Sequence, residues 1–140
     1  MQKRAFLQNK LWRDKAVALM EEMHSVIHWH RLDDTEYDHQ LRQKLLEESK
    51  EVCAASSKEA LVQELADLLE VIEAIARSHN VSLEEIREIQ LKKKAERGGF
   101  DERKFVAVAE HLEGSLGERY CLADPEKHPE INDSWNETSN

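Results

Sequence analysis

The sequence has few of the residues that usually interrupt helices or cross-link a chain. Its 140 residues include four glycines, two prolines and two cysteines, and the glycines and prolines fall after residue 97. Because glycine and proline are the residues that most often interrupt helices, the chain up to residue 97 is free to be helical. The cysteines, Cys53 and Cys121, are too few for a disulfide framework and match no CxxC metal-binding spacing, which favours a reducing compartment. These features predict an all-α protein of the cytoplasm.

Long apolar runs and an excess of basic residues are also missing. No apolar run approaches the roughly 18 residues that a membrane-spanning helix needs, and no apolar region of a signal peptide follows the N-terminus. The formal net charge is -9, from 20 Lys+Arg against 29 Asp+Glu. This balance disfavours a nucleic acid polymer or an anionic membrane as the main partner, because both attract a basic surface. An acidic protein can still bind a cation.

Apolar periodicity and capping residues predict three long helices. Apolar residues recur four or seven positions apart after Thr35, and a broader apolar stripe follows between residues 61 and 75, as in helices that face a core. The first expected helix runs from Thr35, its N-cap, to Ala54. The second begins at a capping box of Ser56 and Glu59 and ends near Ser78. The third begins at a capping box of Ser82 and Glu85 and ends at Gly98-Gly99, with Asn80 in a left-handed turn between the last two helices.

The two ends of the chain carry weaker signals. Residues 11–23 have a helical pattern, whereas residues 25–32 alternate polar and apolar side chains and are expected to be extended. Residues 114–140 hold both prolines and a polar ending, which is typical of a tail. We therefore predict a folded domain over residues 1–106 and a partly disordered C-terminal extension over residues 107–140.

Two pairs of carboxylates interrupt the apolar faces of the first two long helices. Glu48 lies on the apolar face of the first, and Glu51 follows one turn later. Glu64 and Asp67 form a similar pair on the next helix. Residues three apart on a helix point the same way. Two combinations across the helices have the same midpoint in the sequence, between residues 57 and 58: Glu48 with Asp67, and Glu51 with Glu64. An antiparallel hairpin that turns at this midpoint therefore places the pair on the first helix opposite the pair on the second.

Four carboxylates that converge on a partly buried space repel one another unless a cation neutralises them. A set of oxygen ligands without Cys or His suits Mg²⁺, with Mn²⁺ as a substitute, better than zinc or copper. Such metals are the usual means of handling phosphates. A solvated helix face is the alternative for any single glutamate. Glu70 and Glu73 continue the acidic run without partners at matching height and are predicted to be surface residues.

These carboxylates also carry a resemblance to a known family. Glu47-Glu48-x-x-Glu51 followed by Glu64-x-x-Asp67 resembles the EExxE…ExxD signature of the all-α nucleoside triphosphate pyrophosphohydrolases, the MazG-type and phosphoribosyl-ATP pyrophosphohydrolase-like group. Four further segments are similar to the same group: NKLWRDK at 9–15, DDTEY at 33–37, ELADLLEV at 64–71 and ERGGF at 96–100. Two features depart from it: Ala16-Val17 stand where Ile-Pro is usual, and the chain after about residue 107 has no counterpart.

The resemblance implies a Mg²⁺-dependent hydrolase that cleaves a nucleoside or deoxynucleoside triphosphate between its α and β phosphates, releasing monophosphate and pyrophosphate. A house-cleaning role on non-standard nucleotides is a family-level expectation. Carried over by position, Glu48, Glu51, Glu64 and Asp67 are the metal ligands, and Glu47 holds a second metal or orients the attacking water, so that Glu47 and Glu48 are the catalytic pair. The family also implies a homodimer or homotetramer, in which hairpins complete a MazG-like four-helix bundle.

A triphosphate site also needs positive charge from the protein. The candidates for phosphate binding are Arg13 and Lys15 near the N-terminus, and Lys94 and Arg97 one turn apart at the end of the third long helix. The helix dipole favours basic residues at a helix C-terminus whatever their function, so the structural explanation stands beside the functional one.

Two other functions remain open from the sequence. A di-iron carboxylate bundle needs Glu-x-x-His pairs, and Glu21 with His24 and Glu36 with His39 have that spacing. Glu36, however, lies at a helix start, away from any bundle centre. The other alternative is a non-catalytic acidic helical module that binds a nucleotide or a partner and keeps the carboxylates for a structural cation. Such a module has no need of Glu47.

Overall fold

The structure is a computed structural model that describes residues 2–132, 134 and 135. The described residues form helices and no strands, which confirms the all-α prediction. The chain divides into two compact units, residues 1–98 and residues 99–140, which are described separately. The helices are α1 (Asp14–Glu22), α2 (Asp34–Ala54), α3 (Lys58–Ser78), α4 (Leu83–Arg97) and α5 (Leu116–Leu122).

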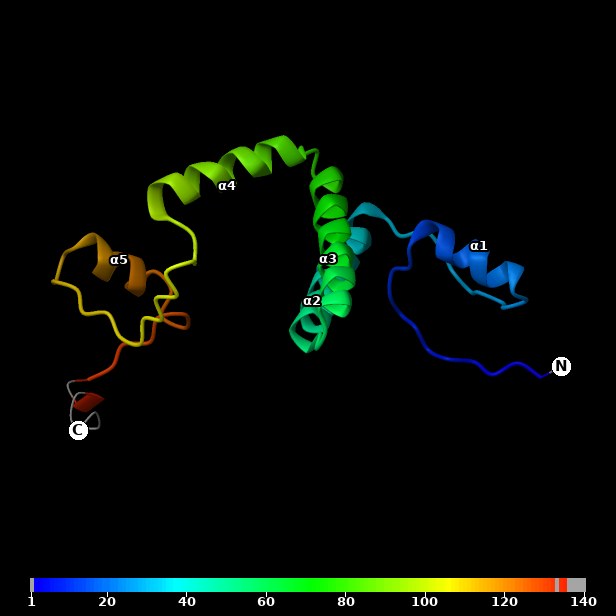
Figure 1. The fold of residues 1–140 in the computed structure, drawn as a ribbon, viewed down its shortest axis with the longest axis horizontal. Coiled ribbons are helices and arrows are strands. Elements are labelled where there is room, and N and C mark those ends of the chain that lie inside the picture. Colours follow the sequence, from blue (N-terminus) through cyan, green and yellow to red (C-terminus); the bar gives the residue numbers. More distant parts are fainter. Residues whose placement is uncertain (1, 133, 136–140) are drawn as a thin grey trace. The chain divides into compact units, whose positions relative to one another are not determined.

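The first unit is built on an antiparallel hairpin of α2 and α3 (Figure 1). Each of the two helices has 21 residues, and they pack against each other. Only residues 55–57 connect them, and Ala55 has an extended backbone that turns the chain after α2. The predicted hairpin is therefore present.

The starts of α2 and α3 differ from the prediction. Asp33, and not Thr35, is the N-cap of α2, since its side chain accepts a hydrogen bond of 2.8 Å from the backbone amide three residues on. Ser57, and not Ser56, caps α3 through an equivalent bond of 3.1 Å. Both capping residues have extended backbones, which direct their side-chain oxygens at the otherwise unpaired amides of the first turn.

The region around α4 matches the sequence pattern closely. Ser82 and Glu85 form the predicted capping box, in which each side chain accepts a hydrogen bond from the other residue's backbone amide. Asn80 has a φ of 56°, so the predicted left-handed turn after α3 is confirmed. Gly98 ends α4 with a φ of 83°, a conformation that glycine adopts without a steric penalty.

The hairpin buries few of its apolar side chains. Leu41, Val71 and Ala76 are the buried apolar residues among those described. By contrast, Leu61, Leu65 and Leu69, spaced four apart on α3, are 38%, 46% and 54% exposed. The apolar stripe expected from the sequence is therefore broader than the surface that α2 covers. A row of leucines stays uncovered in the single chain.

The second unit contains a short helix that the sequence analysis did not predict. Ser115 caps α5, and the ring of Tyr120 lies 5.1 Å from that of His128. The predicted division at residue 106 and the predicted disorder beyond it remain predictions, and residues 133 and 136–140 of that extension lie outside the described residues. Cys53 and Cys121 are free thiols. The described helices include none that is both long and apolar enough to cross a membrane.

Candidate active site

The α2–α3 hairpin brings together three of the four carboxylates predicted to bind metal. Glu48 and Glu51 come from successive turns of α2, and Glu64 comes from α3. Each offers one carboxylate oxygen, and these oxygens lie within 4.8 Å of one another. Across the described part of the chain, no other cluster of three or more His, Cys, Asp or Glu residues has metal-ligating atoms this close. We call these three residues the carboxylate cluster.

Two oxygens of the carboxylate cluster have no hydrogen-bond donor. One oxygen of Glu48 and one of Glu64 are buried and accept no hydrogen bond from the described residues. Burial, assisted by the negative charge of Glu51, raises the pKa of Glu48. A hydrogen bond with Glu51, followed by burial, raises the pKa of Glu64. Without metal, Glu48 and Glu64 therefore retain protons more readily than ordinary glutamates do.

These properties fit a hard divalent cation. The ligands are all oxygen atoms, their charges repel one another, and two of their oxygens have no donor. A bound cation offsets all three features, because it attracts each carboxylate and occupies the position of the missing donors. The donor set therefore agrees with a metal centre that uses Glu48, Glu51 and Glu64.

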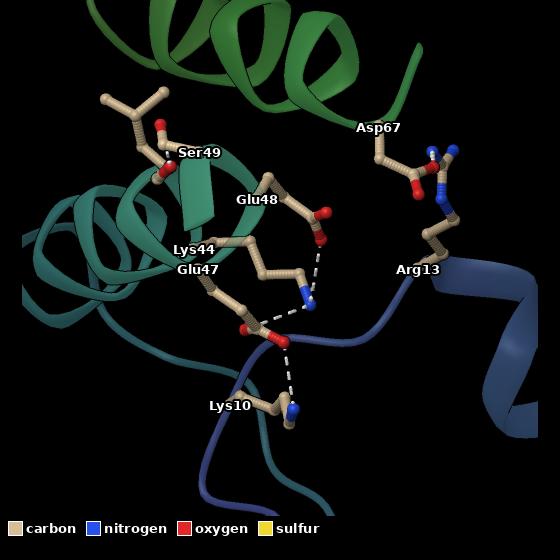
Figure 2. Close-up of polar contacts among 8 residues, drawn as sticks. Lys10, Arg13, Lys44, Glu47, Glu48, Ser49 and Asp67 are labelled. Carbon is tan, nitrogen blue, oxygen red and sulfur yellow. Dashed lines mark hydrogen bonds and ion pairs between the residues drawn. The ribbon is translucent and has the colours of Figure 1, made fainter. Parts of the chain in front are cut away.

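Asp67, the fourth predicted ligand, is engaged elsewhere. Its Oδ1 accepts a hydrogen bond of 2.8 Å from Nη2 of Arg13, the residue just before α1 (Figure 2). The negative charge of Asp67 still contributes to the raised pKa of Glu48, but Asp67 does not belong to the carboxylate cluster. The sequence analysis placed these residues in separate roles, Arg13 on phosphate and Asp67 on metal. The structure joins them in one ion pair.

Two lysines that the sequence analysis did not select neutralise Glu47. Nζ of Lys10 lies 2.9 Å from its Oε1, and Nζ of Lys44 lies 3.5 Å from its Oε2 (Figure 2). The hydrogen bond with Lys10 holds the pKa of Glu47 below its usual value and raises that of Lys10. Lys44 also lies 3.6 Å from Oε1 of Glu48. Its position three and four residues before these glutamates was a signal in the sequence, whereas the approach of Lys10 depends on the fold.

Comparison with models of protein families identifies the family of this chain. The model of the phosphoribosyl-ATP pyrophosphohydrolase family matches residues 13–94, more than half of the chain, and this range spans α1 to α3 and most of α4. The chain belongs to this family. The resemblance seen in the sequence is thereby confirmed, and with it a pyrophosphohydrolase of the MazG-like all-α superfamily, which acts on a phosphoric anhydride with the help of a metal. Comparison with curated proteins and with solved structures gave no match.

Three other basic residues were predicted to bind phosphate in this pyrophosphohydrolase family member: Lys15, Lys94 and Arg97. Lys15 lies in the first turn of α1, and Lys94 and Arg97 lie in the last turns of α4. No ion pair joins any of the three to the carboxylates within the described residues. The backbone carbonyl of Lys94 accepts the amide of Gly98 at 2.8 Å, which is a helix-ending contact. Their roles in phosphate binding remain predictions.

The structure also bears on the di-iron alternative. Neither of the two Glu-x-x-His pairs, Glu21 with His24 and Glu36 with His39, takes part in a metal-sized cluster among the residues that are described. Glu36 lies in the first turn of α2, as expected, and with His39 lines a hollow of about 580 Å³ that is separate from the carboxylate cluster. The geometry therefore favours the all-carboxylate site over a di-iron bundle.

Proposed function

We propose that the protein hydrolyses a nucleoside or deoxynucleoside triphosphate between its α and β phosphates, giving a monophosphate and pyrophosphate, with Mg²⁺ as the metal and Mn²⁺ as a substitute. One observation carries the proposal: Glu48, Glu51 and Glu64 converge within 4.8 Å, with two buried oxygens that lack donors. Membership of the phosphoribosyl-ATP pyrophosphohydrolase family supplies the reaction class.

Each side chain of the site has a proposed role. Glu48, Glu51 and Glu64 hold the metal, and Asp67 becomes a further ligand when Arg13 binds a phosphate in place of Asp67. When bound, the metal neutralises charge on the phosphates and lowers the pKa of water. Glu47 is kept ionised by Lys10, so it accepts a hydrogen bond from the attacking water and orients it.

The proposed reaction is a single displacement at the α phosphorus. The oxygen of the water bonds to the α phosphorus, and the bond from that phosphorus to the α–β bridging oxygen breaks. The electron pair of the broken bond leaves with pyrophosphate, and the proton of the water passes to solvent. Lys15, Lys94 and Arg97 are proposed to assist Arg13 in holding the phosphates.

The uncovered leucines of α3 support the proposed oligomer. Leu61, Leu65 and Leu69 leave an apolar row on the hairpin, and large exposed apolar surfaces mark sites of association. A second hairpin that packs on this row completes a four-helix bundle in a homodimer, or in each half of a homotetramer. Light scattering is expected to give at least twice the 16.3 kDa mass of one chain. We place the catalytic domain in residues 1–106 and the enzyme in the cytoplasm.

The experiment that tests the function is a product analysis. The purified protein is incubated with standard and non-standard nucleoside triphosphates and with phosphoribosyl-ATP, in Mg²⁺ or in EDTA, and the products are separated. We expect monophosphate and pyrophosphate in Mg²⁺ only, with a higher kcat/KM for non-standard nucleotides if the role is house-cleaning. The absence of pyrophosphate from every substrate would favour the non-catalytic binding module, and release of diphosphate with phosphate would show another cleavage point.

A matched pair of variants connects the activity to the site. Glu51→Gln removes one charge from the carboxylate cluster and is expected to lower turnover about 100-fold, the upper end of the roughly 10- to 100-fold cost of changing an outer-shell partner at a metal site. Glu70→Gln is the control, because Glu70 is an exposed residue of α3 that lies 3.7 Å from Arg77. Equal activities of the two variants would contradict the assignment of the metal site.

A further inference from the structure

A polar hollow lies beside the carboxylate cluster, between the N-terminal segment and α2. Its volume is about 370 Å³. The lining side chains are mainly amides and lysines, among them Gln8, Lys10, Gln43, Lys44, Glu47 and Lys50. None of the lining residues found in the described chain is aromatic, and Leu46 is the one large apolar residue among them. We call this cavity the lysine hollow.

The lysine hollow shares a wall with the carboxylate cluster. Glu47 and Lys44 both line the hollow, and Nζ of Lys44 lies 3.6 Å from Oε1 of Glu48, a member of the cluster. Figure 2 shows Lys44 reaching toward Glu47 and Glu48 while Lys10 approaches Glu47 from the N-terminal segment. A ligand in the hollow is therefore next to whatever the carboxylates bind.

The charges of the lysine hollow favour an anion. Lys10, Lys44 and Lys50 bring three positive charges against one negative charge from Glu47, in a chain whose formal net charge is -9. Lys50 forms no ion pair with any described residue, so its ammonium group is available. The lysine ammonium is a compact point charge with three donors that suits phosphate oxygens. A nucleobase fits less well, because the hollow offers no aromatic ring on which a base could stack.

We propose that the lysine hollow is the subsite for the β and γ phosphates and for the pyrophosphate that leaves. This assignment rests on the proposed function, which supplies a triphosphate cleaved at the α phosphorus. When the bond from the α phosphorus to the bridging oxygen breaks, the electron pair moves onto pyrophosphate. Lys10, Lys44 and Lys50 stabilise the charge that develops there, while Glu48, Glu51 and Glu64 would hold the metal.

The test measures binding of inorganic pyrophosphate to the full chain by titration calorimetry in Mg²⁺, where no turnover is needed. Lys50→Gln is expected to weaken pyrophosphate binding about tenfold, the size of one charge-assisted hydrogen bond, and Lys50→Arg is expected to retain most of it. The control is Lys92→Gln on α4, since Lys92 does not line the hollow. Circular dichroism checks that every variant is folded.

A second probe, AMP, separates a subsite from a general loss of positive charge. AMP carries no β phosphate, so its affinity is expected to stay unchanged in Lys50→Gln. Unchanged pyrophosphate affinity in Lys50→Gln, equal weakening of pyrophosphate and AMP, or no pyrophosphate binding by the unsubstituted protein would each overturn the proposal. Full turnover together with any of these results refutes the subsite alone. Lysine-dependent pyrophosphate binding without turnover supports the subsite and refutes the reaction.

Discussion

Replacement of Glu48 by glutamine should have opposite effects on the metal-free and the metal-bound protein. Glu48 is 6% exposed, and one of its oxygens has no donor. Glutamine keeps the shape of the side chain and removes the charge. Without metal the variant should be more stable than the unsubstituted protein, because its buried charge and its repulsion by Glu51 are gone. Mg²⁺ should stabilise the variant less than it stabilises the unsubstituted protein, because the metal has lost an ionised ligand.

The size of the metal-free effect follows from the distances. Two unit charges 4.8 Å apart repel by about 3.5 kcal/mol at an effective dielectric constant of 20 and by about 1 kcal/mol in water. Glu51 is exposed, and Lys44 lies 3.6 Å from Glu48 and offsets part of the repulsion, so the lower figure applies. A gain of about 1 kcal/mol corresponds to a rise of about 4 °C in Tm for a chain of this size.

The assay is thermal unfolding at pH 8, in EDTA and in Mg²⁺, followed by circular dichroism. Glu70→Gln, at the exposed surface of α3, should match the unsubstituted protein in both solutions. A Glu48→Gln variant that melts below the unsubstituted protein in EDTA would refute the argument about the uncompensated charge. A variant with the full Mg²⁺-induced rise in Tm would show that Glu48 is not a metal ligand.

Three further predictions concern pH, packing and capping. The pKa values of Glu48 and Glu64 are raised in the folded state, so these two groups bind protons more tightly in the folded chain than in the unfolded chain. In EDTA, the stability that Glu48 and Glu64 contribute should therefore fall as the pH rises above 4.5, and Tm should fall with it. In Mg²⁺, Tm should instead rise over the same pH range. Leu41→Ala, at a side chain that is 4% exposed, should lower the free energy of unfolding in urea by about 2–5 kcal/mol, and a loss under 1 kcal/mol would contradict its place in the core. Ser57→Ala should cost about 1 kcal/mol in the same measurement and Ser56→Ala much less, whereas equal losses would contradict the observed cap.

The parts of the site that local geometry determines could be predicted from the sequence. Residues one turn apart on a helix share a face, and a connection as short as residues 55–57 forces neighbouring helices to run antiparallel. These two facts bring Glu51 opposite Glu64, as expected from their common midpoint. The capping box of Ser82 was predictable for the same reason, because its contacts span three residues.

The remaining contacts of the site depend on the path of the chain before α2. Arg13 and Asp67 are 54 positions apart, and Lys10 and Glu47 are 37 apart. Residues 2–13, which carry Lys10 and Arg13, and residues 25–33, between α1 and α2, form no helix or strand, so helix geometry could not indicate which carboxylates the N-terminal segment would reach. The missed helix α5 is different. The spacing of Ser115 and Glu118 was a local signal, but a proline-containing, polar context obscured it.

In the proposed reaction, where Asp67 joins the metal ligands and Arg13 binds a phosphate, the ion pair between these two residues links the binding of metal thermodynamically to the binding of nucleotide. A cation that competes for Asp67 frees the guanidinium group of Arg13, and a phosphate that competes for Arg13 frees the carboxylate of Asp67. Each ligand thus removes part of the cost of binding the other. Because such coupling is reciprocal, the factor by which Mg²⁺ tightens the nucleotide equals the factor by which the nucleotide tightens Mg²⁺, and a change of Arg13 to glutamine should reduce both factors together.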